Sequence, residues 1–236
     1  MIDELNARWL AGRAASDLAS AGIVVHVFDG QEAPGKPWLP DASSPVGDHF
    51  AVSIVNAAHP DVYEGGQGPK SRAPGMVLAS TPAMQQRISC AYNRDAGSNN
   101  KQCGVRGGND WCRPGCTKYW CGEDGRKWNC AYRPSQLLEA MQRQDAELPH
   151  GHVPVYGYNE VVLDAWRTPW ADAVPDAILA FFVQPLASAE EKRKARETQQ
   201  AYLADPAVAG TDAARATPLL AYDPLAESAP FSLFAG

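Results

Sequence analysis

The sequence predicts an α+β fold, in which a mixed or antiparallel sheet is flanked by helices and carries a disulfide-stapled loop insertion. Three observations predict this class. Short apolar runs of strand length recur along the chain, segments with helical spacing separate them, and all six cysteines fall between residues 90 and 130. With 236 residues, 45% of them hydrophobic, the chain can bury one core. We therefore expect a single α+β domain over residues 1–236, with a Cys-rich inserted lobe at 90–130.

The first predicted element is a helix over residues 3–20. Leu5, Trp9 and Leu18 recur with a spacing that gives this helix one apolar side, and Gly22 is expected to stop it. The helix should therefore pack on the core through these three side chains.

Strands follow, because β-branched and apolar residues dominate the next runs. The run GIVVHVF at 22–28 is typical of a buried strand, and the Pro- and Gly-rich stretch at 29–48 predicts a loop. In 50–56, FAVSIVN, apolar residues alternate, which places Phe50, Val52 and Ile54 on one face. Two further strands are predicted at 75–80 and 87–92.

After the Cys-rich segment, Pro134 is well suited to the first turn of a helix that runs to about residue 148. Leu137, Leu138 and Met141 should face inward from it. This helix would close the insertion and return the chain to the core.

The last third of the chain predicts three strands and one helix. The strands are YNEVVLD at 158–164, ILAFFV at 178–183 and PLLAY at 218–222. Ser188 followed by Glu191 is a capping-box pattern, which predicts a charged surface helix to about Ala204. The terminal APFSLFAG is apolar enough to dock on the body.

The cysteines indicate how the inserted segment is held. Gly, Asn, Pro and Trp interleave an even number of cysteines there, and few aliphatic residues are present, so three disulfides are the favoured interpretation. The cysteines concerned are Cys90, Cys103, Cys112, Cys116, Cys121 and Cys130. Their pairing is left open. Zinc is the alternative, bound by Cys112, Cys116 and Cys121 with Cys130, or with His150 and His152. Paired CxxC motifs are absent, however, and we expect no metal site.

The inserted segment is also the basic part of an acidic chain. Residues 90–133 carry a net charge of +4, against −10 for the remaining residues and −6 overall. The overall charge disfavours nucleic acid as a partner, whereas the basic lobe suits a glycan or an anionic small molecule. The alternative is that these charges only form a solvated surface that keeps the disulfide loop soluble. Aromatic side chains there can stack on such a ligand, although in a disulfide-rich loop they more often form the lobe's own core. They are Trp111, Tyr119, Trp120 and Trp128.

The location of the protein follows from two features. No apolar run reaches the roughly 18 residues that a membrane span requires, so no span is expected. The first residues, MIDELNARWL, lack the basic and apolar regions of a signal peptide, while the cysteine usage indicates an oxidising compartment. We expect an extracellular or lumenal domain that is an excised part of a larger protein or has lost its leader.

Candidate catalytic residues lie on three of the predicted strands. Glu160 precedes Val161 in an apolar run, where a carboxylate is costly unless it is paired or points to solvent. His26 lies within VVHVF, and Ser53 lies within FAVSIVN. Each of these two residues has a structural alternative: the histidine can be a core residue whose ring nitrogens are hydrogen-bonded, and the serine can be an ordinary strand residue.

His26, Ser53 and Glu160 follow one another in this order on successive predicted strands, and NEVVL is followed by VPDAILAFFV. In these features the chain resembles the ADP-ribosyltransferase superfamily. The Ser-Thr-Ser triplet of that superfamily has no clear counterpart, and Tyr158 stands where many members carry Gln or Glu. The resemblance implies NAD as substrate. It also implies that Glu160 stabilises an oxocarbenium-like transition state, that His26 holds the adenosine-side ribose, that Ser53 orients Glu160 and that Tyr158 faces the acceptor.

Other enzyme templates find less support. No G-x-S-x-G, H-E-x-x-H, Walker or G-x-G-x-x-G sequence is present, and His150-Gly-His152 reads as part of a linker. A paired-carboxylate glycosidase using Glu160 with Asp164 or Asp172 stays open. Three hypotheses remain: a binding module for a glycan or anionic ligand, an NAD-dependent transferase built around Glu160, and a structural domain of a larger extracellular protein.

Overall fold

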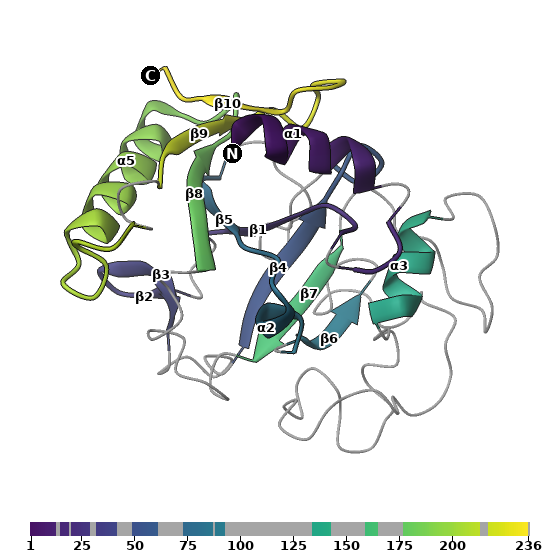
Figure 1. Ribbon diagram of the computed structural model, residues 1–236. Coiled ribbons are helices and arrows are strands. Elements are labelled where there is room, and N and C mark those ends of the chain that lie inside the picture. Colours follow the sequence, from purple (N-terminus) through teal and green to yellow (C-terminus); the bar gives the residue numbers. More distant parts are fainter. Residues whose placement is uncertain are drawn as a thin grey trace.

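The computed structural model describes eleven stretches of the chain. These are residues 1–12, 15–18, 20–28, 32–41, 49–60, 73–86, 88–92, 134–142, 159–164, 177–212 and 217–235. Within them the dominant feature is one eight-stranded mixed sheet with helices packed against it (Figure 1). The α+β class expected from the sequence is therefore confirmed at this level.

The sheet runs in the order β10-β9-β8-β5-β1-β4-β7-β6. Its strands are β1 (Ile23–Val27), β4 (His49–Val55), β5 (Gly75–Leu78), β6 (Ile88–Tyr92), β7 (Glu160–Asp164), β8 (Ile178–Val183), β9 (Leu219–Tyr222) and β10 (Phe231–Leu233). Every neighbouring pair is antiparallel except β8 and β9, which run parallel. A separate two-stranded sheet pairs β2 (Glu32–Ala33) with β3 (Lys36–Pro40).

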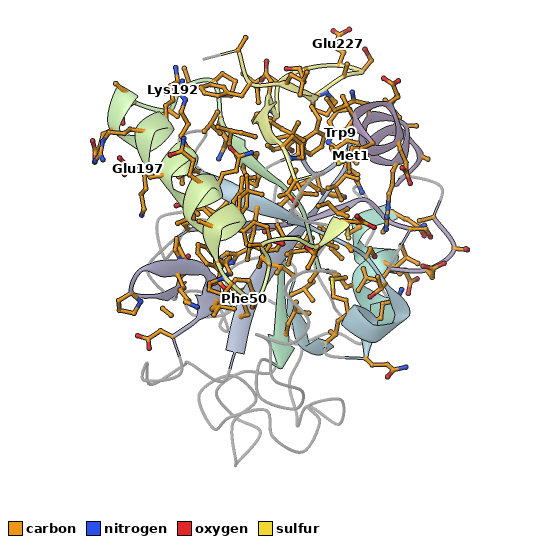
Figure 2. All side chains as sticks on the ribbon, turned by 60° about the vertical axis from the view of Figure 1, so that its left-hand side comes forward. Met1, Trp9, Phe50, Lys192, Glu197 and Glu227 are labelled. Carbon is orange, nitrogen blue, oxygen red and sulfur yellow. The ribbon has the colours of Figure 1, made fainter. Side chains whose placement is uncertain are left out.

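Both faces of the large sheet are covered. The face that we call the α5 face carries Val24, Val52 and Phe181, and packs against residues of α5 (Ala189–Ala204), α3 (Pro134–Gln142) and α2 (Pro82–Gln85). Phe50 lies near the centre of the molecule on this face (Figure 2). The opposite face, which we call the α1 face, carries Val25 and packs against α1 (Ile2–Ala11). The alternation of side chains along each strand produces this division.

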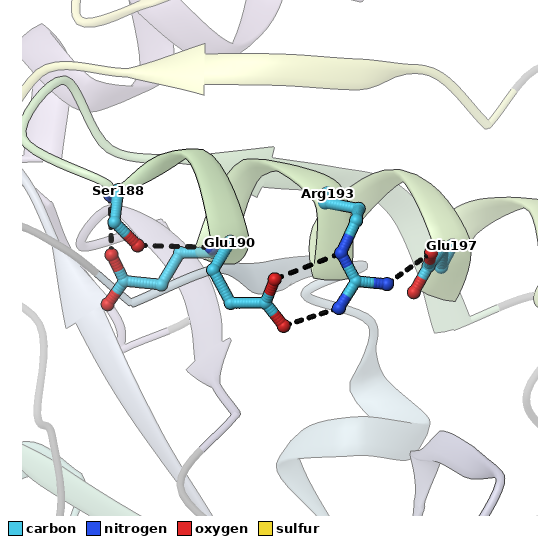
Figure 3. A network of polar contacts seen from close by, with 5 residues as sticks. Ser188, Glu190, Arg193 and Glu197 are labelled. Carbon is cyan, nitrogen blue, oxygen red and sulfur yellow. Dashed lines mark hydrogen bonds and ion pairs between the residues drawn. The ribbon is translucent and has the colours of Figure 1, made fainter.

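Most predicted elements are present with shorter bounds. Phe50, Val52 and Ile54 share the α5 face, and Leu137 and Leu138 are buried with them, as the apolar spacing predicted. The capping box of α5 is confirmed in full: the Ser188 hydroxyl accepts a hydrogen bond from the Glu191 amide, and the Glu191 carboxylate accepts one from the Ser188 amide (Figure 3).

Two predicted boundaries were wrong. The helix predicted over 3–20 ends at Ala11, and its C-cap Gly12 lies so close to Ala21 that a Cβ there would be only 2.3 Å from the Ala21 carbonyl oxygen. The loop predicted at 29–48 contains the β2–β3 hairpin, which turns at Gly35 with a φ of +76°. The sequence also did not predict α2, or that the docked C-terminal segment pairs as strand β10.

The Cys-rich inserted lobe at 90–130 lies outside the described residues, except for the backbone of residues 90–92 in β6. The three disulfides therefore remain a prediction. Within the described part of the chain, no helix is long and apolar enough to cross a membrane. Those same stretches hold no group of three or more His, Cys, Asp or Glu residues that could bind a metal ion.

Candidate functional site

Three candidate residues lie on three adjacent interior strands of the sheet. His26 is on β1, Ser53 on β4 and Glu160 at the start of β7. Their exposed fractions are 1%, 2% and 0%, so none of them points to bulk solvent. This burial rules out the alternative that Glu160 points to solvent from an edge strand.

The strand register brings Ser53 and Glu160 together. Val52 pairs with Val161 in antiparallel β4 and β7, and the next pair in that register is Ser53 with Glu160. Val52 and Val161 both belong to the α5 face, so their neighbours Ser53 and Glu160 project to the α1 face. A hydroxyl beside a buried carboxylate can donate a hydrogen bond to it and orient it.

The same register separates His26 from that pair. His26 stacks on Phe50, with ring centroids 3.7 Å apart, and lies 6.0 Å from Phe28; both phenylalanines belong to the α5 face. The sheet itself therefore stands between the imidazole and Glu160. The resemblance to ADP-ribosyltransferases implied that both would act on one NAD molecule, and these two side chains do not meet that requirement.

Asn159 fixes the position where β7 begins. Its side-chain amide donates to the carbonyl of Ile54 at 2.8 Å and accepts from the amide of Ile54 at 2.9 Å. Asn159 is fully buried, so these two bonds replace water that the Ile54 backbone cannot reach. This pairing sets Glu160 at the first position of the strand, beside β4.

His26 has a partner that the sequence analysis missed. Its Nδ1 lies 2.7 Å from the carbonyl oxygen of Ala51, and its Nε2 lies 2.9 Å from a carboxylate oxygen of Glu32. The Glu32 side chain is only 6% exposed, and it stands in the stretch predicted as a loop. Pro34-Gly35, a turn-forming dipeptide, is the sequence signal that could have revealed this hairpin.

The remaining predicted site residues cannot be placed. Tyr158, the aromatic residues of the insertion, the cysteines beyond the β6 backbone, Asp172, and both His150 and His152 lie outside the described residues. The tryptophans that the structure does describe, such as Trp38, are buried in the core and offer no exposed aromatic face to a ligand.

Two of the hollows in the described part of the chain can be compared with the candidate residues. One, of about 10 Å³, lies under α2 among apolar side chains such as Val52 and Met84, and has room for about one water molecule. The other is a wide depression of about 520 Å³ between α1 and the turn before β10, lined by Trp9, Leu10 and Leu225. Neither is lined by Ser53, Glu160 or His26.

Comparison with known proteins adds no relative: no protein-family model, curated protein or solved structure matches this chain.

Proposed function

We propose that this chain is a non-enzymatic binding module, in which the sheet is a rigid support and the basic Cys-rich segment binds a glycan or another anionic ligand. The observation that carries this proposal is the anchoring of that segment. It leaves the sheet from edge strand β6 and returns through α3, and these two elements pack against each other. Buried Ile88 of β6 and Leu137 and Met141 of α3 belong to one apolar cluster. Binding loops are commonly held in this way by a packed scaffold.

The charge of the segment supports an anionic ligand. Residues 90–133 carry a net charge of +4, in contrast to the acidic remainder of the chain. Four aromatic residues accompany the basic ones: Trp111, Tyr119, Trp120 and Trp128. Aromatic faces stack on sugar rings while lysine and arginine pair with sulfate or carboxylate groups, so the two residue types together suit an acidic or sulfated glycan.

The buried state of the predicted catalytic residues also favours binding over catalysis. His26 and Glu160 lie on opposite faces of the sheet, each at most 1% exposed. An enzyme that used both would need a substrate to pass through the sheet. Their local contacts instead hold strands and the β2–β3 hairpin together.

The test is binding of the purified chain to a sulfated heparin oligosaccharide, compared with an uncharged glycan of the same length. We expect the triple variant K118A/R126A/K127A to bind at least tenfold more weakly than the unaltered chain. Trp120→Ala should also weaken binding, since stacking on one aromatic face is worth about 1–3 kcal/mol in comparable nucleic-acid sites. Equal affinity of the triple variant and the unaltered chain would contradict the proposal.

A matched control is available on α5. Lys192 and Glu197 project outward from this helix (Figure 2). The variant K192A/R193A/K194A removes two lysines and one arginine from the described surface, as the triple variant does, without touching the Cys-rich segment. It should bind heparin with unchanged affinity, so that any loss in the triple variant reports on the segment and not on net charge alone.

A second candidate function is NAD cleavage by Glu160, and one observation favours it. Ser53 stands beside Glu160 in the register, as the resemblance to ADP-ribosyltransferases implies for the residue that orients the catalytic carboxylate. The test is nicotinamide release from NAD by the unaltered chain, by Glu160→Gln and by the exposed control Glu197→Gln. Release that only Glu160→Gln abolishes would support this candidate; release that survives in Glu160→Gln, or no release at all, would reject it.

A further inference from the structure

The β2–β3 hairpin is tied to the body of the protein at two separate points. At its turn, Nζ of Lys36 lies 2.6 Å from a carboxylate oxygen of Asp205, just beyond the end of α5. At its start, Glu32 reaches His26 on β1. The hairpin therefore lies beside the end of α5 (Figure 1) and also contacts strand β1 through Glu32.

A chain of aromatic contacts lies between these two points. Trp38 of the hairpin packs edge-on against Tyr202 of α5, with ring centroids 5.6 Å apart. Tyr202 contacts Phe181 at 5.3 Å, and Phe181 contacts Phe28 at 6.3 Å. Phe28 in turn lies beside His26, so the contacts form a closed circuit that begins and ends on the hairpin. The hairpin thus covers part of the apolar cluster on the α5 face.

The contacts of His26 set how many protons it must hold. A carbonyl oxygen can only accept a hydrogen bond, so Nδ1 must donate to Ala51. If Glu32 is ionised, Nε2 must donate as well, and the imidazole carries a positive charge. If Glu32 is protonated instead, its hydroxyl donates to a neutral Nε2. In either case the observed contact between His26 and Glu32, which we call the closed state of the hairpin, requires one proton between Nε2 and the carboxylate.

The groups that surround His26 leave few other ways to supply that proton. Among the described elements packed against it, β4 contributes the Phe50 ring and the Ala51 carbonyl, β5 contributes Met76 as its register partner, and β1 contributes Phe28. The titratable group that these described contacts bring to it is Glu32, from β2. The next charged pair on the hairpin, Lys36 with Asp205, is engaged at the turn.

We propose that the His26–Glu32 pair is a proton-operated latch, which holds the β2–β3 hairpin closed over the aromatic cluster and releases it when the pair loses its proton to water. Without that proton, the lone pair of Nε2 faces a carboxylate, and neither group can donate. The two then repel each other in a site that water reaches poorly, because His26 is 1% exposed. This inference does not depend on the proposed binding function.

The sign of the pH effect follows from proton counting. The closed state holds the proton and the open state gives it up, so opening becomes easier as the pH rises. The opening equilibrium should increase by up to about tenfold for each pH unit once the open state has lost the proton. The scan runs from about pH 5 to 9, which includes the range in which histidine side chains ordinarily change charge.

Hydrogen exchange of the full-length chain, followed by mass spectrometry, tests the latch. After correction for the intrinsic pH dependence of exchange, peptides covering residues 32–41 should exchange faster as the pH rises, while peptides from β8 and β9 stay unchanged. In Glu32→Gln the amide can donate to a neutral Nε2 while Nδ1 still donates to Ala51. This variant should therefore keep the hairpin closed and lose the pH dependence.

A control variant separates the latch from general loosening. Lys36→Met removes the other tie, and should raise exchange of residues 32–41 at every pH while leaving the slope with pH unchanged. The proposal is overturned if Glu32→Gln keeps the slope of the unaltered chain, or if β8 and β9 open in step with the hairpin. Nitrogen NMR of His26 gives a second readout: in the closed chain Nδ1 should carry a proton, and Nε2 should either carry one or accept one from a protonated Glu32. Finding a bare Nε2 with an ionised Glu32 would also overturn the proposal.

Discussion

Two asparagine side chains form hydrogen bonds with strand backbone of the kind that a neighbouring strand would form. Asn159 exchanges two hydrogen bonds with the backbone of Ile54, and Asn6 does the same with Phe231, donating to its carbonyl at 3.0 Å and accepting from its amide at 2.9 Å. The first supports the interior pair β4–β7, and the second covers the outer edge of β10. Each amide group supplies one donor and one acceptor, which is what an open backbone position needs.

The two sites differ in burial, and this difference makes a matched prediction. Asn159→Ala should lower the free energy of unfolding by about 2–4 kcal/mol, because the Ile54 amide and carbonyl would lose partners in a dry site. Asn6→Ala should lower it by only about 1 kcal/mol, since water can replace the amide where Asn6 is half-buried. Urea unfolding of both variants measures the two losses; equal losses would show that burial does not set the cost.

The sequence could identify Glu160 as a residue of interest but not the role of Asn159 beside it. The apolar run after Glu160 is local, and it predicted a buried strand correctly. The partner of Asn159 is Ile54, which is 105 residues away in the chain. No local pattern in NEVVL reveals a side-chain pairing of that kind, because it depends on which strand becomes the neighbour.

At the scale of single elements, α5 shows which stabilising features are strong. Its capping box satisfies backbone amides at the first turn, whereas Arg193, between Glu190 and Glu197, forms exposed ion pairs on the outer face (Figure 3). The Arg193 guanidinium lowers the pKa of Glu190 through hydrogen bonding and charge. Exposed pairs of this kind contribute little to stability, because water already solvates both charges.

Loss of the cap should therefore matter more than loss of the ion pairs. Ser188→Ala should lower the free energy of unfolding by about 1 kcal/mol, because the Glu191 amide loses its acceptor. Ser188→Asp should retain most of the stability, since a carboxylate is also a good N-cap and favours the helix N-terminus. Thermal unfolding of the two variants checks this order, and a Ser188→Asp variant as unstable as Ser188→Ala would contradict it.

Strand β5 carries a glycine for a steric reason. A Cβ on Gly75 would lie 2.2 Å from the carbonyl oxygen of His26 and 2.6 Å from Cζ of Phe182. Gly75→Ala should lower the free energy of unfolding by about 3 kcal/mol, at the upper end of overpacking effects, since the His26 contact is with backbone that cannot rotate away. Denaturant unfolding measures this; a change below about 0.5 kcal/mol would mean that the strands can separate without cost.

Elements with strong periodicity could be predicted, and those shaped by distant contacts could not. The β-branched run of β1 and the alternation in β4 each predicted the right strand and, for β4, the right buried face. The hairpin β2–β3 was missed because KPWLP contains two prolines and has no alternation. Its stability comes from Trp38 packing on Tyr202 and from the tie to Asp205.

At the scale of the whole molecule, the order and register of the strands determine which candidate residues lie together. The sequence placed His26, Ser53 and Glu160 on strands, and all three are on adjacent strands in the sheet. Whether three side chains share one face depends on the register between strands, since a shift by one residue reverses the face. Here the register pairs Ser53 with Glu160 and turns His26 to the α5 face.

The stability of the whole molecule should also depend on acid, through the Lys36–Asp205 tie. The hydrogen bond from Lys36 is the main cause that lowers the pKa of Asp205 below its ordinary value of 3.8, and the amide of Ala207 adds to it. The folded state thus favours the ionised carboxylate. The stabilisation is present above the unfolded pKa and is lost as the pH falls through the folded pKa.

Lys36→Met separates this acid effect from the proposed latch. The unaltered chain should lose stability below about pH 4, and the variant should lose less over the same range, because its Asp205 retains only the Ala207 hydrogen bond. At neutral pH the variant should be at most about 1 kcal/mol less stable, since Lys36 is half exposed. Urea unfolding from about pH 2.5 to 7 tests both statements. Because the His26–Glu32 latch weakens as the pH rises, the variant should change the slope of stability with pH on the acid side alone. A change of slope on the alkaline side would mean that the two ties of the hairpin act as one unit.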